Sequence, residues 1–158
     1  MQKNIVNTLH TNKHPNWKSK ILTVMMDKCN AIRNAVIETN PTTIILSCYF
    51  HMMKTVKNYF SGVSNGNNYW EMTAKNHLQL LHLSVNHQIF NNLAEIIIEK
   101  WRIDGFVDAA TKFRDGYLCD QWKNWYIGSI PEAGQGNTNN LLESFNGTIK
   151  ALVPKSTI

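Results

Sequence analysis

The chain has 158 residues, enough to bury one hydrophobic core and too few for two complete domains with linkers. Hydrophobic residues make up 43% and charged residues 17%, a composition that indicates an ordered protein with a weakly charged surface. No run approaches the roughly 18 apolar residues of a membrane span, and the first residues lack the apolar core of a signal peptide. We therefore expect a soluble, intracellular protein with no membrane partner.

The positive charge is concentrated at the start of the chain. The net charge is +5, and residues 1–60 hold eight lysines and arginines against two acidic residues. This basic third of the chain either faces a polyanion such as DNA or is simply a solvated basic surface. The three cysteines are an odd number without paired spacing, which argues against a secreted disulfide framework.

The first half of the chain has the pattern of alternating strands and helices. Residues 21–26 and 42–48 are short apolar runs without alternation, which is typical of strands covered on both faces. Between them, residues 30–38 place apolar side chains at helical spacing, and residues 50–60 predict another helix. A strand, a helix and a strand in this order predict a βαβ unit with a parallel pair of strands.

The second half is predominantly helical. Residues 61–68 predict a loop, and leucines and isoleucines then recur at helical spacing through residues 69–125, which indicates three or four helices. A glycine-bearing loop over 127–136 and a final helix over 138–152 complete the chain. Five large aromatic residues at helical spacing are expected to be mainly core, although such rings can also stack on bases: Trp70, Trp101, Trp122, Trp125 and Tyr126.

Two carboxylates are candidates for chemistry. Asp27 follows the first predicted strand, and α/β sheets bind ligands at the carboxyl ends of their strands. A carboxylate at that position needs a cation or hydrogen-bond donors, but an aspartate there can also cap the next helix. Glu143 has the same two interpretations, because it lies three residues after Asn140 in a capping arrangement.

Cys48 and His51 form a C-x2-H motif across a strand-to-helix turn. Thiolate and imidazole are zinc ligands, but this pair is half of a zinc site at best, and no second CxxC or HxxxH follows. His77, His82 and His87 could complete a site only if the helices happened to bring them there. The alternative is a buried thiol beside a histidine that orients another group or contacts DNA.

The order of these features resembles that of the Mutator-like (MULE) transposases. The resemblance covers residues 17–151 and runs through VMMDKCNAIRNAV, CYFHMMKTVKNYF and GNTNNLLESFNGTIK. Its most specific parts are the C-x2-H turn and the TNN-x2-ES-x-N block.

The resemblance implies an α/β fold, a partial RNase H-like core carrying a DDE triad with an α-helical insertion. Residues 17–60 and 127–153 would belong to the core and residues 69–125 to the insertion, within a single partial domain over 1–158. Asp27 would be the second catalytic Asp and Glu143 the final Glu, both ligands of Mg²⁺ or Mn²⁺. Cys48 and His51 would lie near transposon-end DNA or serve as structural support.

The implied function is metal-dependent cleavage and strand transfer of DNA, with the transposon ends and the target as partners, in the nucleus and with a possible homo-oligomer. Lys54, Lys57 and Lys150 are candidates for contacts to the DNA backbone. The family's first Asp has no counterpart, because no acidic residue precedes Asp27, so we expect a C-terminal portion of the core that is inactive alone. The alternative is a transposase-derived remnant that binds DNA or a protein without catalysis.

Overall fold

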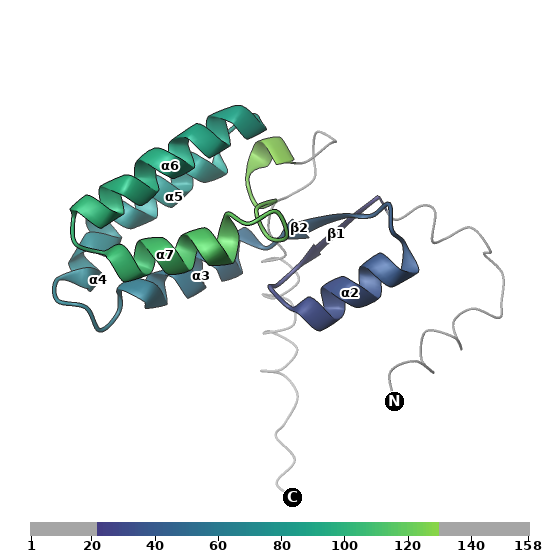
Figure 1. Cartoon of the computed structure of the whole chain (residues 1–158), viewed down its shortest axis with the longest axis horizontal. Helices are drawn as coiled ribbons and strands as arrows, with labels where there is room; N and C mark the ends of the chain where they lie inside the picture. Colours follow the sequence, from purple (N-terminus) through teal and green to yellow (C-terminus); the bar gives the residue numbers. More distant parts are fainter. Residues whose placement is uncertain (1–21, 130–158) are drawn as a thin grey trace, which may run out of the picture. The chain divides into compact units, whose positions relative to one another are not determined.

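The computed structural model describes residues 22–129, and the chain there is a mostly helical α/β structure (Figure 1). Its first part follows the predicted order of strand, helix, strand and helix. The elements are β1 (Thr23–Met26), α2 (Asn30–Thr39), β2 (Ile44–Ser47) and α3 (Tyr49–Phe60). The structure therefore confirms the strand, helix, strand order of the predicted βαβ unit.

The two strands pair in parallel. The Ile44 amide donates to the Leu22 carbonyl at 2.9 Å, and the Cys48 amide donates to the Met26 carbonyl at 2.9 Å, so both strands advance in the same direction. The expectation that both strands are covered on both faces is wrong for their first residues. Thr23 to Met25 are half-buried and only Met26 of β1 is buried, because the described residues contain just these two strands.

Most residues between Gly66 and Tyr117 are helical, as their periodicity predicts. The elements are α4 (Gly66–Tyr69), a π-helix η2 (Trp70–Ala74), α5 (Lys75–His82), α6 (His87–Ile103), α7 (Val107–Tyr117) and a 3₁₀ turn η3 (Ile127–Ser129). None of the helices between residues 22 and 129 is long and apolar enough to cross a membrane.

Part of the predicted loop over 61–68 is helical instead, because α4 already begins at Gly66 and continues through η2 into α5. The chain reverses sharply here: Asn65 has a φ of 61°, and a Cβ on Gly66 would lie 2.0 Å from the Phe60 carbonyl oxygen. Glycine therefore permits a close approach that no other residue allows.

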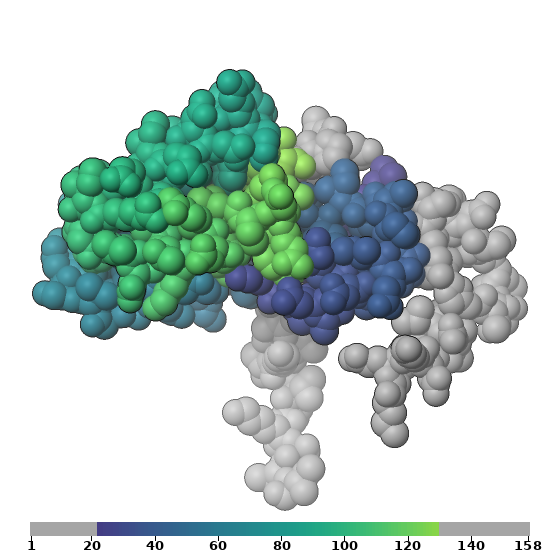
Figure 2. All heavy atoms as spheres, viewed as in Figure 1, coloured from purple at the N-terminus to yellow at the C-terminus, as the bar shows by residue number. Residues whose placement is uncertain are grey.

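The described residues form two compact units. One comprises residues 22–24 and 29–45 with α2, and the other comprises residues 25–28 and 46–129 with α3 to α7. The hydrophobic core belongs to the second unit, where α6 and α7 lie side by side (Figure 2). As expected from their spacing, the five large aromatic residues are buried: Trp70, Trp101, Trp122, Trp125 and Tyr126.

Candidate functional site

Asp27 and Cys48 are neighbours because each directly follows one of the paired strands. Asp27 comes after Met26 of β1, and Cys48 comes after Ser47 of β2. The hydrogen bond from the Cys48 amide to the Met26 carbonyl, at 2.9 Å, joins the two strand ends. Parallel strands bring their carboxyl ends to the same edge of a sheet, where α/β proteins place their ligands.

Asp27 does not cap the next helix. Cys29 occupies the N-cap position of α2, and the helix begins at Asn30. The helix-cap interpretation of Asp27 is therefore wrong, and the carboxylate takes part in a different contact.

The C-x2-H motif is bent into a compact turn by the start of α3. Cys48 is the N-cap residue, and its carbonyl accepts the Met52 amide at 3.0 Å. His51 lies in the first turn, and residues three apart on a helix are on the same side. The His51 Nδ1 atom is consequently 3.3 Å from the Cys48 Sγ atom.

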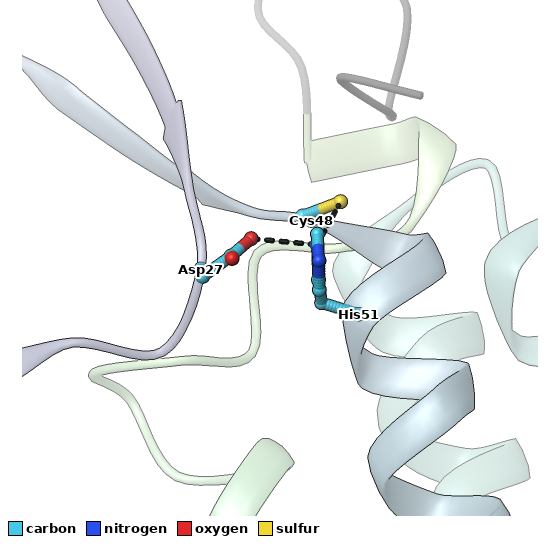
Figure 3. A group of neighbouring side chains, drawn as sticks. All are labelled: Asp27, Cys48 and His51. Atoms are coloured by element: carbon cyan, nitrogen blue, oxygen red, sulfur yellow. Dashed lines mark hydrogen bonds and ion pairs between the residues drawn. The ribbon is translucent and has the colours of Figure 1, made fainter. Parts of the chain in front are cut away.

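These three side chains converge on one small volume (Figure 3). His51 Nδ1 is 2.7 Å from Asp27 Oδ1, and one ligand-type atom from each of the three residues lies within 4.8 Å of the others. Cys48 is 2% exposed, whereas the side chains of His51 and Asp27 are 30% and 51% exposed. The cluster thus has a buried sulfur side and a solvent-accessible carboxylate side.

The geometry differs from that of a nucleophilic cysteine with a histidine base. Such a site uses one imidazole nitrogen for the sulfur and the other for the carboxylate that orients the ring. Here the same atom, His51 Nδ1, faces both Cys48 and Asp27. Since a carboxylate oxygen only accepts, Nδ1 donates its proton to Asp27, and the sulfur is left as a weak second acceptor. The oxygen, nitrogen and sulfur atoms of the three residues are all atom types that can ligate a cation.

Lys54 and Lys57 are not part of this cluster. Lys54 and Lys57 are exposed on α3, and the Lys57 Nζ atom is 3.0 Å from Glu71 Oε1. The hydrogen bond from Lys57 holds the pKa of the Glu71 carboxyl below its usual value. Glu143 and Lys150 lie outside the described residues, so their roles stay predictions.

The three histidines of the helical segment have structural partners. Trp101 Nε1 donates to His77 Nδ1 at 3.0 Å, and His82 Nδ1 donates to the Trp125 carbonyl at 2.8 Å. His87 Nδ1 is 3.1 Å from the Tyr126 hydroxyl. Within residues 22–129, Asp27, Cys48 and His51 are the only group of three or more metal-ligating side chains that lie close enough to share an ion.

Sequence reasoning placed Asp27 and the C-x2-H pair at strand ends but missed that they touch. The signal that could have found the contact was the predicted parallel pairing, because it requires the ends of the two strands to coincide.

No family model, curated protein or solved structure matches this chain. The residues and the geometry of the site are therefore the basis for its function.

Proposed function

We propose that the chain is part of a MULE-type DNA transposase core, RNase H-like in fold, which acts in metal-dependent cleavage and strand transfer of DNA. Asp27 and Glu143 are its catalytic carboxylates. The observation that carries this proposal is the position of Asp27, an accessible carboxylate at the carboxyl end of β1, beside the C-x2-H residues at the end of β2. The helical segment after α3 agrees with the insertion that the resemblance implies.

His51 acts on Asp27 in this proposal as a positioning residue. The His51 Nδ1 atom lies 2.7 Å from Asp27 Oδ1, and this contact restrains the rotation of the Asp27 side chain, which is 51% exposed. Hydrogen bonds of this kind orient the carboxylates of metal and phosphoryl-transfer sites. The C-x2-H motif thereby has a role that needs no direct contact with DNA.

The described residues around Asp27 do not by themselves fit Mg²⁺ or Mn²⁺. These ions prefer oxygen ligands, whereas the two side chains grouped with the Asp27 carboxylate offer an imidazole nitrogen and a thiol sulfur. The positioning of Asp27 by His51 depends on neither ion.

A non-enzymatic role in binding DNA or a protein is the second candidate. It is favoured by one observation, that the side chains grouped with the Asp27 carboxylate are an imidazole and a thiol rather than further carboxylates. Both the transposase and a non-enzymatic DNA-binding protein bind DNA, but only the transposase cleaves it.

DNA binding is tested by fluorescence anisotropy of a labelled duplex over a range of salt concentrations. Log affinity falls as log salt rises, and each protein–phosphate contact that is lost makes this slope less steep by about 0.9. We expect the double variant Lys54→Ala with Lys57→Ala to have a slope less steep by about 1. This is the change for one lost phosphate contact rather than two, because Lys57 already pairs with Glu71. Lys112→Ala, an exposed lysine on α7, is the matched control. No binding at low salt contradicts both DNA-binding candidates.

Cleavage is tested on the same chain with a supercoiled plasmid and Mg²⁺ or Mn²⁺. Nicking that disappears in Asp27→Asn and persists in Asp115→Asn supports the enzyme. DNA binding without any nicking agrees with both candidates, because a partial core is expected to be inactive alone.

A further inference from the structure

We propose that Asp27, Cys48 and His51 form a binding site for a zinc-class divalent cation, with three protein ligands and a fourth position open to solvent. The ligand atoms are Asp27 Oδ1, Cys48 Sγ and His51 Nδ1. The inference goes beyond the proposed function and does not depend on it, because these three side chains are sufficient for it.

The spacing of the donor atoms suits a tetrahedral ion. With bonds of about 2.0–2.3 Å, the ligands of tetrahedral zinc lie about 3.3–3.7 Å apart. The distance of 3.3 Å between His51 Nδ1 and Cys48 Sγ is already at this spacing. The distance of 2.7 Å between His51 Nδ1 and Asp27 Oδ1 is that of a hydrogen bond and must widen by about 0.6 Å to reach the tetrahedral spacing of a nitrogen and an oxygen ligand. Asp27 is exposed, so a rotation of its side chain can supply this change.

The chemistry of the donors selects the class of ion. A thiolate and an imidazole bind zinc and similar first-row ions strongly, whereas Mg²⁺ and Ca²⁺ prefer oxygen. Three protein ligands and one open position are the arrangement of catalytic zinc sites, in contrast to the closed four-ligand structural sites. The oxygen, nitrogen and sulfur atoms of this cluster therefore suit zinc better than Mg²⁺.

The backbone that carries the cluster is held in place by hydrogen bonds. The Ser47 amide donates to the Asn124 carbonyl at 2.9 Å, and the Ser47 hydroxyl donates to the Trp122 carbonyl at 3.0 Å. Cys48 is the N-cap residue of α3, and Met52 of this helix is completely buried. The sulfur and the imidazole are therefore presented by a fixed strand-to-helix turn, which lowers the entropic cost of assembling the site.

Binding of a cation requires that the protons on His51 Nδ1 and on the Cys48 thiol leave these two ligand atoms. The distance of 2.7 Å between His51 Nδ1 and Asp27 Oδ1 requires a proton on Nδ1, which donates to the carboxylate. When a cation binds, the ring proton resides on Nε2, the thiol proton of Cys48 passes to solvent, and the ion takes the position between the three ligand atoms.

The test is titration of the full chain with Zn²⁺, followed by isothermal calorimetry, and with Co²⁺, followed by absorption. We expect one ion per chain and a thiolate-to-cobalt charge-transfer band. Asp27→Asn and Cys48→Ser should each weaken zinc binding by at least about tenfold, since even the loss of an outer-shell partner costs 10–100-fold. Cys48→Ser should also abolish the band, and Asp27→Asn should retain it.

Three controls separate this site from other donors in the chain. Cys119→Ser and Asp115→Asn replace the same residue types elsewhere on the second unit and should change nothing. His10→Gln with His14→Gln removes the two histidines near the start of the chain. Circular dichroism checks that each variant is folded. Because Cys48 is buried and Cys48→Ser can disturb folding, Asp27→Asn at an exposed position is the second, independent test.

The inference is overturned if Asp27→Asn and Cys48→Ser bind zinc as the unaltered chain does, or if binding is lost only with His10 and His14. It is also overturned if millimolar Mg²⁺ displaces the zinc, because that result indicates an oxygen site. None of these readouts involves DNA, so a failure of the transposase proposal is a separate result.

Discussion

His82 is half-buried in the helical unit and contacts two aromatic residues. Its ring stacks on Tyr49 with ring centroids 3.9 Å apart, and its Nδ1 atom donates to the Trp125 carbonyl at 2.8 Å. Burial lowers the pKa of His82, and the hydrogen bond to Trp125 opposes that shift only in part. Burial also lowers the pKa of His77, which accepts the indole proton of the buried Trp101. Both rings are therefore held neutral by the fold.

Unfolding should become easier as the pH falls below about 6.5, the usual pKa of histidine in an unfolded chain. The folded-state pKa values of His77 and His82 are lowered, so the unfolded chain binds more protons and the stability rises with pH in this window. Urea unfolding between pH 7.5 and pH 5 measures the effect, which His82→Gln should reduce. Gln79→Ala, on the exposed side of α5, should retain the full pH dependence. A pH-independent stability of the unaltered chain contradicts the prediction.

The cation cluster is the other residue-scale feature. Each of its members has an ordinary local explanation: the end of a strand for Asp27, a helix N-cap for Cys48 and a first helical turn for His51. Only their common contact makes them a candidate site.

At the scale of the elements, α6 shows how local sequence and packing agree. Its buried residues recur at intervals of three and four, as on one face of a helix. At its end, the Phe106 amide bonds to the Trp101 carbonyl at 2.8 Å and the Gly105 amide to the Arg102 carbonyl at 3.0 Å, which is the Schellman arrangement. Gly105 has a φ of 91°, a left-handed conformation that glycine adopts without strain. The buried face consists of Phe90, Ala94, Ile97, Ile98 and Trp101.

The start of α6 gives a prediction about helix capping. The side chain of Asn86 accepts the Ile89 amide at 2.9 Å, which satisfies one of the unpaired amides of the first turn. Asn86→Ala should lower the free energy of unfolding by about 1 kcal/mol. The measurement is urea unfolding at pH 7.5.

Asn92→Ala is the matched control for this change, because Asn92 is an exposed asparagine inside the same helix. It should leave the stability unchanged or raise it slightly, since alanine has the higher helix propensity. Equal losses in the two variants are incompatible with a capping role for Asn86.

At the scale of the whole molecule, burial is distributed unequally between the two units. The second unit has an aromatic core in which the rings of Phe60 and Trp101 meet edge to face at 5.0 Å. In the first unit, α2 has no buried residue, and Ile32 is 54% exposed. The apolar contacts that stabilise a helix against opening are thus abundant for α6 and few for α2.

Hydrogen exchange of the full chain should therefore resolve two levels of protection. We expect the amides of α2 to be protected at least about tenfold less than those of the buried face of α6, because local opening needs little loss of apolar contact. Equal protection of the two helices in an exchange experiment on the unmodified chain contradicts this expectation. That result would mean that α2 opens only when the whole chain unfolds.

Much of the fold follows from short-range pattern. The apolar runs before Asp27 and Cys48 are strands, and the periodic segment that begins at Tyr69 is mostly helical as far as Tyr117, whereas its last predicted residues, 118–125, form no helix. The predicted loop after Phe60 is partly wrong, because a close approach of Gly66 to the Phe60 carbonyl starts a helix early. Such an approach depends on the packing of two helices and is invisible in local composition.

By itself, the sequence determined the strand and helix periodicities, the aromatic core and the position of Asp27 at a strand end. These depend on hydrogen bonds and apolar spacing within a few residues of each other along the chain. Only the tertiary structure decided that Asp27 meets His51 at 2.7 Å and that the same nitrogen atom faces Cys48. This contact depends on the pairing register of two strands that a helix separates in sequence, and a change of register by one residue would redirect every side chain at the strand ends.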